Sequence, residues 1–157
     1  MPDRFQAKKG ANMTTINRKA GALWSGDSRS GVGTISTESQ AVKQLPYNYQ
    51  TRFGEQPGTN PEELIAAAHA ACFSMALAST LKKNGYEPKK TDTNAACTIV
   101  SSNGGYEITH MQLHVRAEVP GIGEMAFQKL VEEADQHCPV SNLLRNGLKI
   151  EIDAVLK

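Results

Sequence analysis

Three cysteines are the residues of this 157-residue chain best suited to nucleophilic, redox or metal chemistry. Cys72 lies in the middle of the alanine-rich stretch AAAHAACFSMAL, Cys138 begins the stretch CPVSNLL, and Cys97 lies within NAACTIV. A thiol inside an apolar helix could be a small core residue, a metal ligand or a buried nucleophile. The surroundings of each cysteine must therefore decide among these roles.

The three cysteines lie at different positions on their predicted helices and strand, and these positions affect the thiol pKa differently. Pro139 is a favoured first residue of a helix, which makes Cys138 the capping residue of that helix. Free backbone N–H groups at a helix N-terminus lower the pKa of a thiol. Cys72 has no such donors in mid-helix, and burial alone raises a thiol pKa, so a nucleophilic Cys72 would need a nearby cation. Cys97 alternates with apolar neighbours on a predicted strand and has neither feature.

Two histidines adjoin these thiols and allow other kinds of chemistry. His69 precedes Cys72 by three residues on the same helix face, and His137 is next to Cys138. The four side chains could form a zinc site, but neither pair has finger-like spacing, and we predict no metal. A Cys–His nucleophile with His69 as the base is a second alternative, although a helical neighbour at that spacing has restricted access to the sulfur. A redox pair of thiols explains the same residues.

Composition narrows the possible partners and the compartment. Lysine and arginine number 17 and aspartate and glutamate 16, for a net charge of +1. Nucleic acids and anionic membranes usually select a basic patch, so we expect neither as a partner. Three unevenly spaced cysteines do not form the even set of a disulfide framework. Reduced thiols in the cytoplasm are the simpler expectation.

The chain is long enough for one domain, which we expect to span residues 13–157. Residues 1–12 are polar, lack the apolar run of a signal peptide, and are expected to form a mobile N-terminal extension. The stretch 64–81 contains no charged residue. It is marginal in length for a membrane span and too weakly apolar to favour insertion, so a helix buried on nearly all sides within the domain is expected instead.

The elements that must position the thiols can be read from periodicity and capping residues. The central helix is expected to begin after Asn60 or Thr59, with Pro61 in its first turn, and to end at Asn84-Gly85. Met125 and its apolar neighbours at helical spacing predict an amphipathic helix, and alternating apolar residues predict strands on either side of it. The predicted strands are 16–25, 32–37, 45–52, 94–100, 111–119 and 148–152, and the further predicted helices are 124–136 and 139–145. This order predicts an α+β fold with antiparallel β-sheets wrapped around a central helix.

Two long stretches of the sequence also resemble a known family. YNYQTRFGEQPGTNPEELIAAAHAACFSMAL followed by HCPVSNLL resembles the OsmC/Ohr family of thiol peroxidases, and WSGDSRSGVGTISTES with TRF resembles its OsmC branch. The resemblance covers nearly all of residues 13–157 and implies an intertwined homodimer. By motif position it implies that Cys72 is the peroxidatic cysteine, Cys138 the resolving cysteine, Arg52 the stabiliser of the thiolate and Glu62 the carboxylate that orients Arg52.

The resemblance also implies a reaction. A peroxidatic thiolate attacks the O–O bond of an organic hydroperoxide, or more weakly of hydrogen peroxide, and becomes a sulfenic acid. The resolving thiol condenses with it to an intramolecular disulfide, which an external dithiol reduces. No cofactor is implied, and the role is defence against oxidative or osmotic stress. A redox sensor without turnover, or a small-molecule-binding dimer, would use the same cysteines and is the alternative.

Helix geometry adds a prediction about assembly. Arg52 keeps its charge at any relevant pH, and Glu62 can pair with it in a bidentate manner. Glu62 and Cys72 are ten residues apart, about 15 Å along one helix, so one arginine would struggle to reach both within a chain. Two antiparallel copies of the helix crossing near Ala67 would place Glu62 of one beside Cys72 of the other. We therefore predict a homodimer with active sites at the subunit interface.

Apolar residues flank the proposed site in the sequence. An apolar surround favours an organic hydroperoxide over hydrogen peroxide, because burial of the alkyl group is favourable. The residues predicted to line this substrate pocket are Tyr49, Phe53, Phe73, Met75 and Val140.

Overall fold

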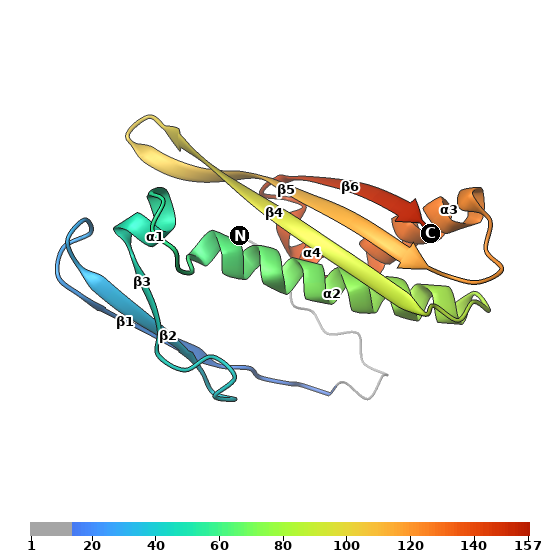
Figure 1. Cartoon of the computed structure of the whole chain (residues 1–157), viewed down its shortest axis with the longest axis horizontal. Coiled ribbons are helices and arrows are strands. Elements are labelled where there is room, and N and C mark those ends of the chain that lie inside the picture. The colour runs from blue at the N-terminus through green and yellow to red at the C-terminus, as the bar shows by residue number, and fades with distance from the viewer. Residues whose placement is uncertain (1–13) are drawn as a thin grey trace, which may run out of the picture.

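The computed structural model describes residues 14–157, which form two three-stranded sheets and four helices (Figure 1). The predicted extension, residues 1–12, lies outside the described residues. The smaller sheet is antiparallel, with the strand order β1-β2-β3. Its strands are β1 (Ala20–Ser25), β2 (Val32–Thr37) and β3 (Leu45–Asn48). In Figure 1 this sheet stands apart from the larger one, and α2 lies between them.

The predicted strand 45–52 is wrong in its second half, where the chain forms the short helix α1 (Tyr49–Phe53). Asn48 ends β3 and caps this helix, because its side chain accepts a hydrogen bond from the backbone N–H of Thr51. The hydroxyl of Thr51 accepts in return from the backbone N–H of Asn48. These two reciprocal bonds form a capping box, which outweighs the strand propensity of the aromatic residues nearby.

The central helix α2 (Pro61–Lys83) begins and ends as its capping residues predict. Asn60 accepts a hydrogen bond from the backbone N–H of Glu63 at the start of the helix. At its end Gly85 has a φ of 86°, and the N–H groups of Gly85 and Tyr86 reach back to the carbonyls of Lys82 and Leu81. This is a Schellman ending, which glycine favours because it adopts positive φ without a steric penalty.

Only one side of α2 is covered by the chain itself. That side packs against β4 (Lys90–Ser102), α3 (Glu124–His137) and α4 (Pro139–Leu144). Ala67, Ala71 and Met75, on the other side, are exposed. The expected burial of this helix on nearly all sides is therefore not found within a single chain. Among residues 14–157, α2 is also the one helix long and apolar enough to cross a membrane, a property it shares with core helices.

The larger sheet is mixed, which corrects the expectation of antiparallel sheets throughout. Its order is β4-β5-β6, with β5 (Gly105–Glu118) in the centre and β6 (Lys149–Leu156) at one edge. β4 and β5 form an antiparallel hairpin, whereas β5 and β6 are parallel. The parallel pairing follows from the crossover through α3 and α4, which returns the chain to the end of the sheet where β5 began.

The core lies between the larger sheet and the helices. The predicted alternation of β5 is confirmed, because Met111, Leu113 and Val115 are buried and the intervening residues are exposed. The predicted helix at 124–136 is also confirmed, and three of the four residues expected to face inward, Leu130, Val131 and Ala134, are buried. The fourth, Met125, is 88% exposed, and Phe127 is buried in the core.

Candidate active site

An ion pair between Arg52 and Glu62 forms the first part of the site. Arg52 lies near the end of α1 and Glu62 in the first turn of α2. The guanidinium donates two hydrogen bonds to the carboxylate, from Nη2 to Oε1 at 2.6 Å and from Nε to Oε2 at 3.2 Å. The Glu62 side chain is 6% exposed and that of Arg52 is 36% exposed. Glu62 also raises the pKa of Arg52 further above its usual value, so this guanidinium is a fixed, oriented positive charge.

A pocket of about 450 Å³ opens beside this ion pair. Arg52 and Arg29 both line it, and the guanidinium of Arg29 lies 5.4 Å from the centre of the Tyr49 ring. Phe53 and Tyr106 stack in the wall with their ring centres 4.4 Å apart. The pocket is therefore mainly aromatic, and its aromatic residues are Trp24, Tyr47, Tyr49, Phe53 and Tyr106.

Of the five residues predicted to line a substrate pocket, the structure places only Tyr49 and Phe53 in this one. Phe73 is fully buried in the core and does not line this pocket. Met75 is 75% exposed on the uncovered side of α2. Val140 is half-buried, and it meets Cys72 through its backbone.

The sequence prediction missed Trp24, Tyr47 and Tyr106, which come from three other segments. The sequence does contain one indication of where Tyr106 lies, the Asn103-Gly104 pair that precedes it. Asn103 and Gly104 both have positive φ, of 46° and 80°, and form the two-residue turn between β4 and β5. Asn-Gly is the most favourable pair for such a hairpin turn. It places Tyr106 at the tip of a long hairpin, within reach of α1.

The two thiols Cys72 and Cys138 form the second part of the site. The structure brings them together across a separation of 66 positions, close enough for the Cys138 thiol to raise the pKa of Cys72. Cys138 is fully buried and caps α4. The backbone N–H of Ser141 donates to its Sγ at 3.5 Å.

One influence on Cys72 favours its thiolate. The backbone of Val140, in the first turn of α4, lowers the pKa of Cys72. Burial has the larger effect and raises the pKa of Cys72, and the neighbouring Cys138 thiol raises it further. Within residues 14–157 of one chain, none of the groups that shift this pKa is a cation.

The structure thus brings the predicted site residues together as two pairs. Arg52 pairs with Glu62 and Cys72 pairs with Cys138. Glu62 and Cys72 lie on one helix about 15 Å apart. Cys97, on β4, is half-buried, and its pKa is raised by burial and by the charge of Glu62.

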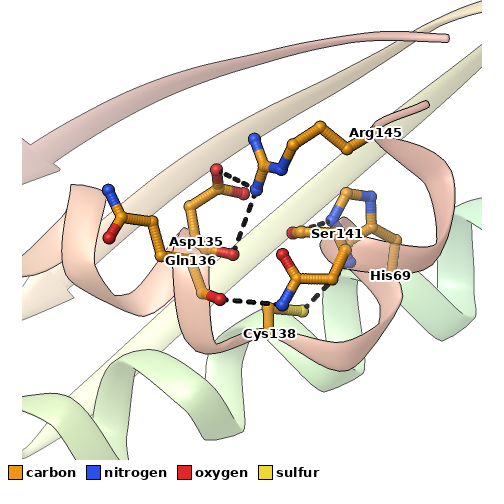
Figure 2. A network of polar contacts seen from close by, with 7 residues as sticks. His69, Asp135, Gln136, Cys138, Ser141 and Arg145 are labelled. Carbon is orange, nitrogen blue, oxygen red and sulfur yellow. Dashed lines mark hydrogen bonds and ion pairs between the residues drawn. The ribbon is translucent and has the colours of Figure 1, made fainter. Parts of the chain in front are cut away.

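The side chain of His69 is directed to Ser141 on α4. It is fully buried, and its Nε2 lies 2.7 Å from the hydroxyl oxygen of Ser141 (Figure 2). Burial lowers its pKa. Among residues 14–157, no three histidine, cysteine or carboxylate side chains are grouped so that they could hold a metal ion.

The fold and both pairs can now be compared with known proteins. The model of the family described as OsmC-like protein matches residues 54–153. The chain belongs to this family. Peroxiredoxin OsmC of Escherichia coli strain K12 is 45% identical over 143 residues, covering 91% of this chain and 99% of that protein.

Two more distant relatives, both organic hydroperoxide resistance proteins, are similar to this chain in sequence or in fold. The organic hydroperoxide resistance protein of Xanthomonas axonopodis pv. citri is 33% identical over 96 residues, which cover 60% of this chain and 66% of that protein. A crystal structure of an organic hydroperoxide resistance protein from Elizabethkingia anophelis superposes with a TM-score of 0.71 at 26% identity. It covers 92% of this chain and all of that one. The α+β architecture is therefore that of the OsmC family.

Proposed function

We propose that this protein is a cysteine-based peroxidase that reduces organic hydroperoxides. The Cys72 thiolate attacks the O–O bond, which gives an alcohol and a Cys72 sulfenic acid. The Cys138 thiol then condenses with the sulfenic acid, forming a disulfide and releasing water. An external dithiol restores both thiols by disulfide exchange, and no bound cofactor takes part.

The observation that carries this proposal is the contact between the two thiols. Cys138 is buried and faces Cys72 directly, so a sulfenic acid on Cys72 would meet a thiol already in place. The names of the relatives, a peroxiredoxin and an organic hydroperoxide resistance protein, support the same reaction class.

The raised pKa of Cys72 supports a site shared between two subunits. A peroxidatic cysteine must be a thiolate, and burial opposes this within one chain. The fixed charge of Arg52 would lower the pKa of Cys72, but in the same chain Arg52 lies with Glu62 at the far end of α2. If two copies of α2 cross antiparallel, Arg52 of each subunit comes close to Cys72 of the other.

Exposed apolar surface supports such a dimer. The smaller sheet makes its main contacts with α1 rather than with the core, and every residue of β1 is exposed. Leu23 and Val32 on this sheet are 67% and 61% exposed, and Met75 on α2 is 75% exposed. A sheet with no core of its own is not stable alone in water, so a partner subunit is its natural cover.

The aromatic pocket supports an organic substrate. Hydrogen peroxide gains nothing from apolar surface, whereas an alkyl or aryl group gains about 25 cal/mol for each Å² that it buries. Stress defence is the role that fits such a reaction. The unpaired cysteines favour a reducing compartment such as the cytoplasm.

A steady-state assay with cumene hydroperoxide and a dithiol tests the proposed function. We expect sustained turnover in the wild type, loss of turnover in Cys72→Ser, and nearly unchanged turnover in the matched control Cys97→Ser. One round of thiol oxidation that no dithiol reverses would contradict the enzyme and indicate a redox sensor.

A further inference from the structure

His69 is a buried polar residue that the proposed reaction does not use. It lies one turn before Cys72 on α2 and is fully buried, like the core residues Phe73 and Leu77 on the same side of the helix. Its Nδ1 atom has no hydrogen-bond partner among residues 14–157. A buried imidazole costs stability relative to an apolar side chain of similar size, so its presence calls for another explanation than core filling.

The partner of His69 belongs to the turn that carries both thiol contacts. Ser141 accepts or donates through its hydroxyl at 2.7 Å from His69 Nε2, and its backbone N–H donates to Cys138 Sγ. The backbone of the preceding residue, Val140, lies close enough to Cys72 to lower the pKa of its thiol. A single turn of backbone, residues 138–141, therefore carries the Cys138 thiol, the N–H that donates to its sulfur, and the backbone next to Cys72.

The rest of α4 is attached elsewhere (Figure 2). Arg145 pairs with Asp135 of α3, with Nη2 2.6 Å from Oδ2, and Asn142 donates to the backbone carbonyl of Gln136 at 2.7 Å. Both contacts tie α4 to α3. Apart from the thiol contacts, the His69–Ser141 bond is the side-chain hydrogen bond that ties α4 to α2 in the described part of the chain.

We propose that His69 and Ser141 are positioning residues that hold the 138–141 turn against α2, so that Cys138 meets the Cys72 sulfenic acid before a second hydroperoxide does. The proposal rests on the proposed function. A sulfenic acid has two competing fates, which are condensation with a thiol to a disulfide and water, or oxidation by another hydroperoxide to a sulfinic acid and an alcohol. The first depends on the effective concentration of the Cys138 thiol at Cys72, which a fixed turn raises.

The first experiment measures that effective concentration without any peroxide. The Cys72–Cys138 disulfide is equilibrated with glutathione buffers in the wild type, His69→Leu, His69→Gln and Ser141→Ala. Leucine removes the hydrogen bond at similar volume, whereas the glutamine amide can donate to the hydroxyl or accept from it. We expect His69→Leu and Ser141→Ala to lower the effective concentration about tenfold, as for one lost hydrogen bond, and His69→Gln to retain most of it.

The second experiment measures the partition of the sulfenic acid. Each variant receives cumene hydroperoxide in small excess, and mass spectrometry gives the ratio of disulfide to Cys72 sulfinic acid. We expect this ratio to fall about tenfold in His69→Leu and in Ser141→Ala, with no further fall in the double variant, because both act through one bond. Ser74→Ala is the matched control, because Ser74 hydrogen-bonds Thr93 at 2.7 Å and ties α2 to β4 instead.

The outcomes separate the two proposals. Equal ratios in the wild type and Ser141→Ala, equal loss in His69→Gln and His69→Leu, or the same loss in Ser74→Ala would each overturn the positioning role. If His69→Leu does not fold, Ser141→Ala and His69→Gln still decide the question. A wild type that forms no Cys72–Cys138 disulfide with either oxidant would instead overturn the proposed function.

Discussion

The first turn and the middle of α2 carry complementary halves of the proposed reaction centre. At its first turn Glu62 holds the charge of Arg52 beside an aromatic pocket. Further along the helix, Cys72 faces Cys138. The guanidinium half has a fixed cation and a pocket but no nucleophile, and the thiol half has two nucleophiles but no cation among its described neighbours. In the proposed dimer, two antiparallel subunits would let each half complete the other.

The halves also differ in how the chain holds them. The thiol half is built on the core, where Cys138, His69 and Ser141 are fully buried. The guanidinium half lies on α1 and the smaller sheet, most of whose surface is exposed. We therefore expect the thiol pair to remain formed in an isolated chain, and the pocket to depend on the partner subunit for its rigidity.

The largest effect should come from removing the second nucleophile of the thiol half. In Cys138→Ser no intramolecular disulfide can form, so the Cys72 sulfenic acid should persist or be oxidised to a sulfinic acid. Mass spectrometry after one equivalent of hydroperoxide measures both products. Recovery of a disulfide through Cys97 would show that the contact between Cys72 and Cys138 is not what resolves the sulfenic acid.

Removing the cation of the guanidinium half should have the next largest effect. Arg52→Ala should raise the pKa of Cys72 by about one to two units and slow peroxide attack roughly 10- to 100-fold at neutral pH. The sign follows from the charge, because losing a cation disfavours the thiolate and moves the rate–pH profile to higher pH. The pH dependence of Cys72 alkylation measures the shift.

Arg52→Lys is the matched control for that variant. Lysine keeps the positive charge but lacks the planar fork that pairs with Glu62 at two atoms. An intermediate rate would support an oriented charge. If the rate–pH profile is unchanged in Arg52→Ala, Arg52 does not stabilise the Cys72 thiolate.

A smaller effect is expected from the wall of the aromatic pocket. Phe53→Ala removes a ring that stacks on Tyr106, so the KM for cumene hydroperoxide should rise about tenfold as apolar contact is lost. The rate with hydrogen peroxide should change little. An equal loss for both peroxides would mean that the ring supports Arg52 rather than the substrate.

The smallest effect concerns the pH dependence of stability in the thiol half. Burial lowers the pKa of His69, while Asp135 opposes this shift and Arg145 adds to it. The stability that follows from a neutral His69 is present above the unfolded pKa of about 6.5 and is lost as pH falls through the lower folded pKa. Urea unfolding at pH 7.5 and pH 5 should therefore show a smaller pH dependence in His69→Gln, by at most about 1.4 kcal/mol per pH unit. If the free energy of unfolding depends equally on pH in the wild type and in His69→Gln, the pKa of His69 is not lowered by folding.

Local signals predicted much of the fold. The cap at Asn60, the glycine at Gly85 and the alternation of β5 are properties of neighbouring residues, and all three predictions are confirmed. Helix α1 was missed because its aromatic residues favour a strand, and the capping box with Thr51 decides the matter. The parallel pairing of β6 could not be read locally, because the crossover sets it.

In the site, too, the residues within continuous motifs could be predicted, whereas contacts between distant segments could not. Cys72, Cys138, Arg52 and Glu62 could be named from the sequence because they lie in long motifs, and the structure adds which of them meet. The pocket wall could not be predicted, since Trp24, Tyr47 and Tyr106 come from separate strands and meet only in three dimensions. Ser141 was missed because nothing near it in the sequence points to His69, 72 positions earlier.

Hybrid dimers test the central claim, that Arg52 serves Cys72 of the other subunit, most directly. Arg52→Ala and Cys72→Ser are each expected to be nearly inactive, and the two are refolded together in equal amounts. In a mixed dimer the intact Arg52 of one chain faces the intact Cys72 of the other, so one of its two sites is complete. Random mixing should restore about a quarter of the wild-type activity. Activity no higher than that of the two variants kept apart would contradict the shared site.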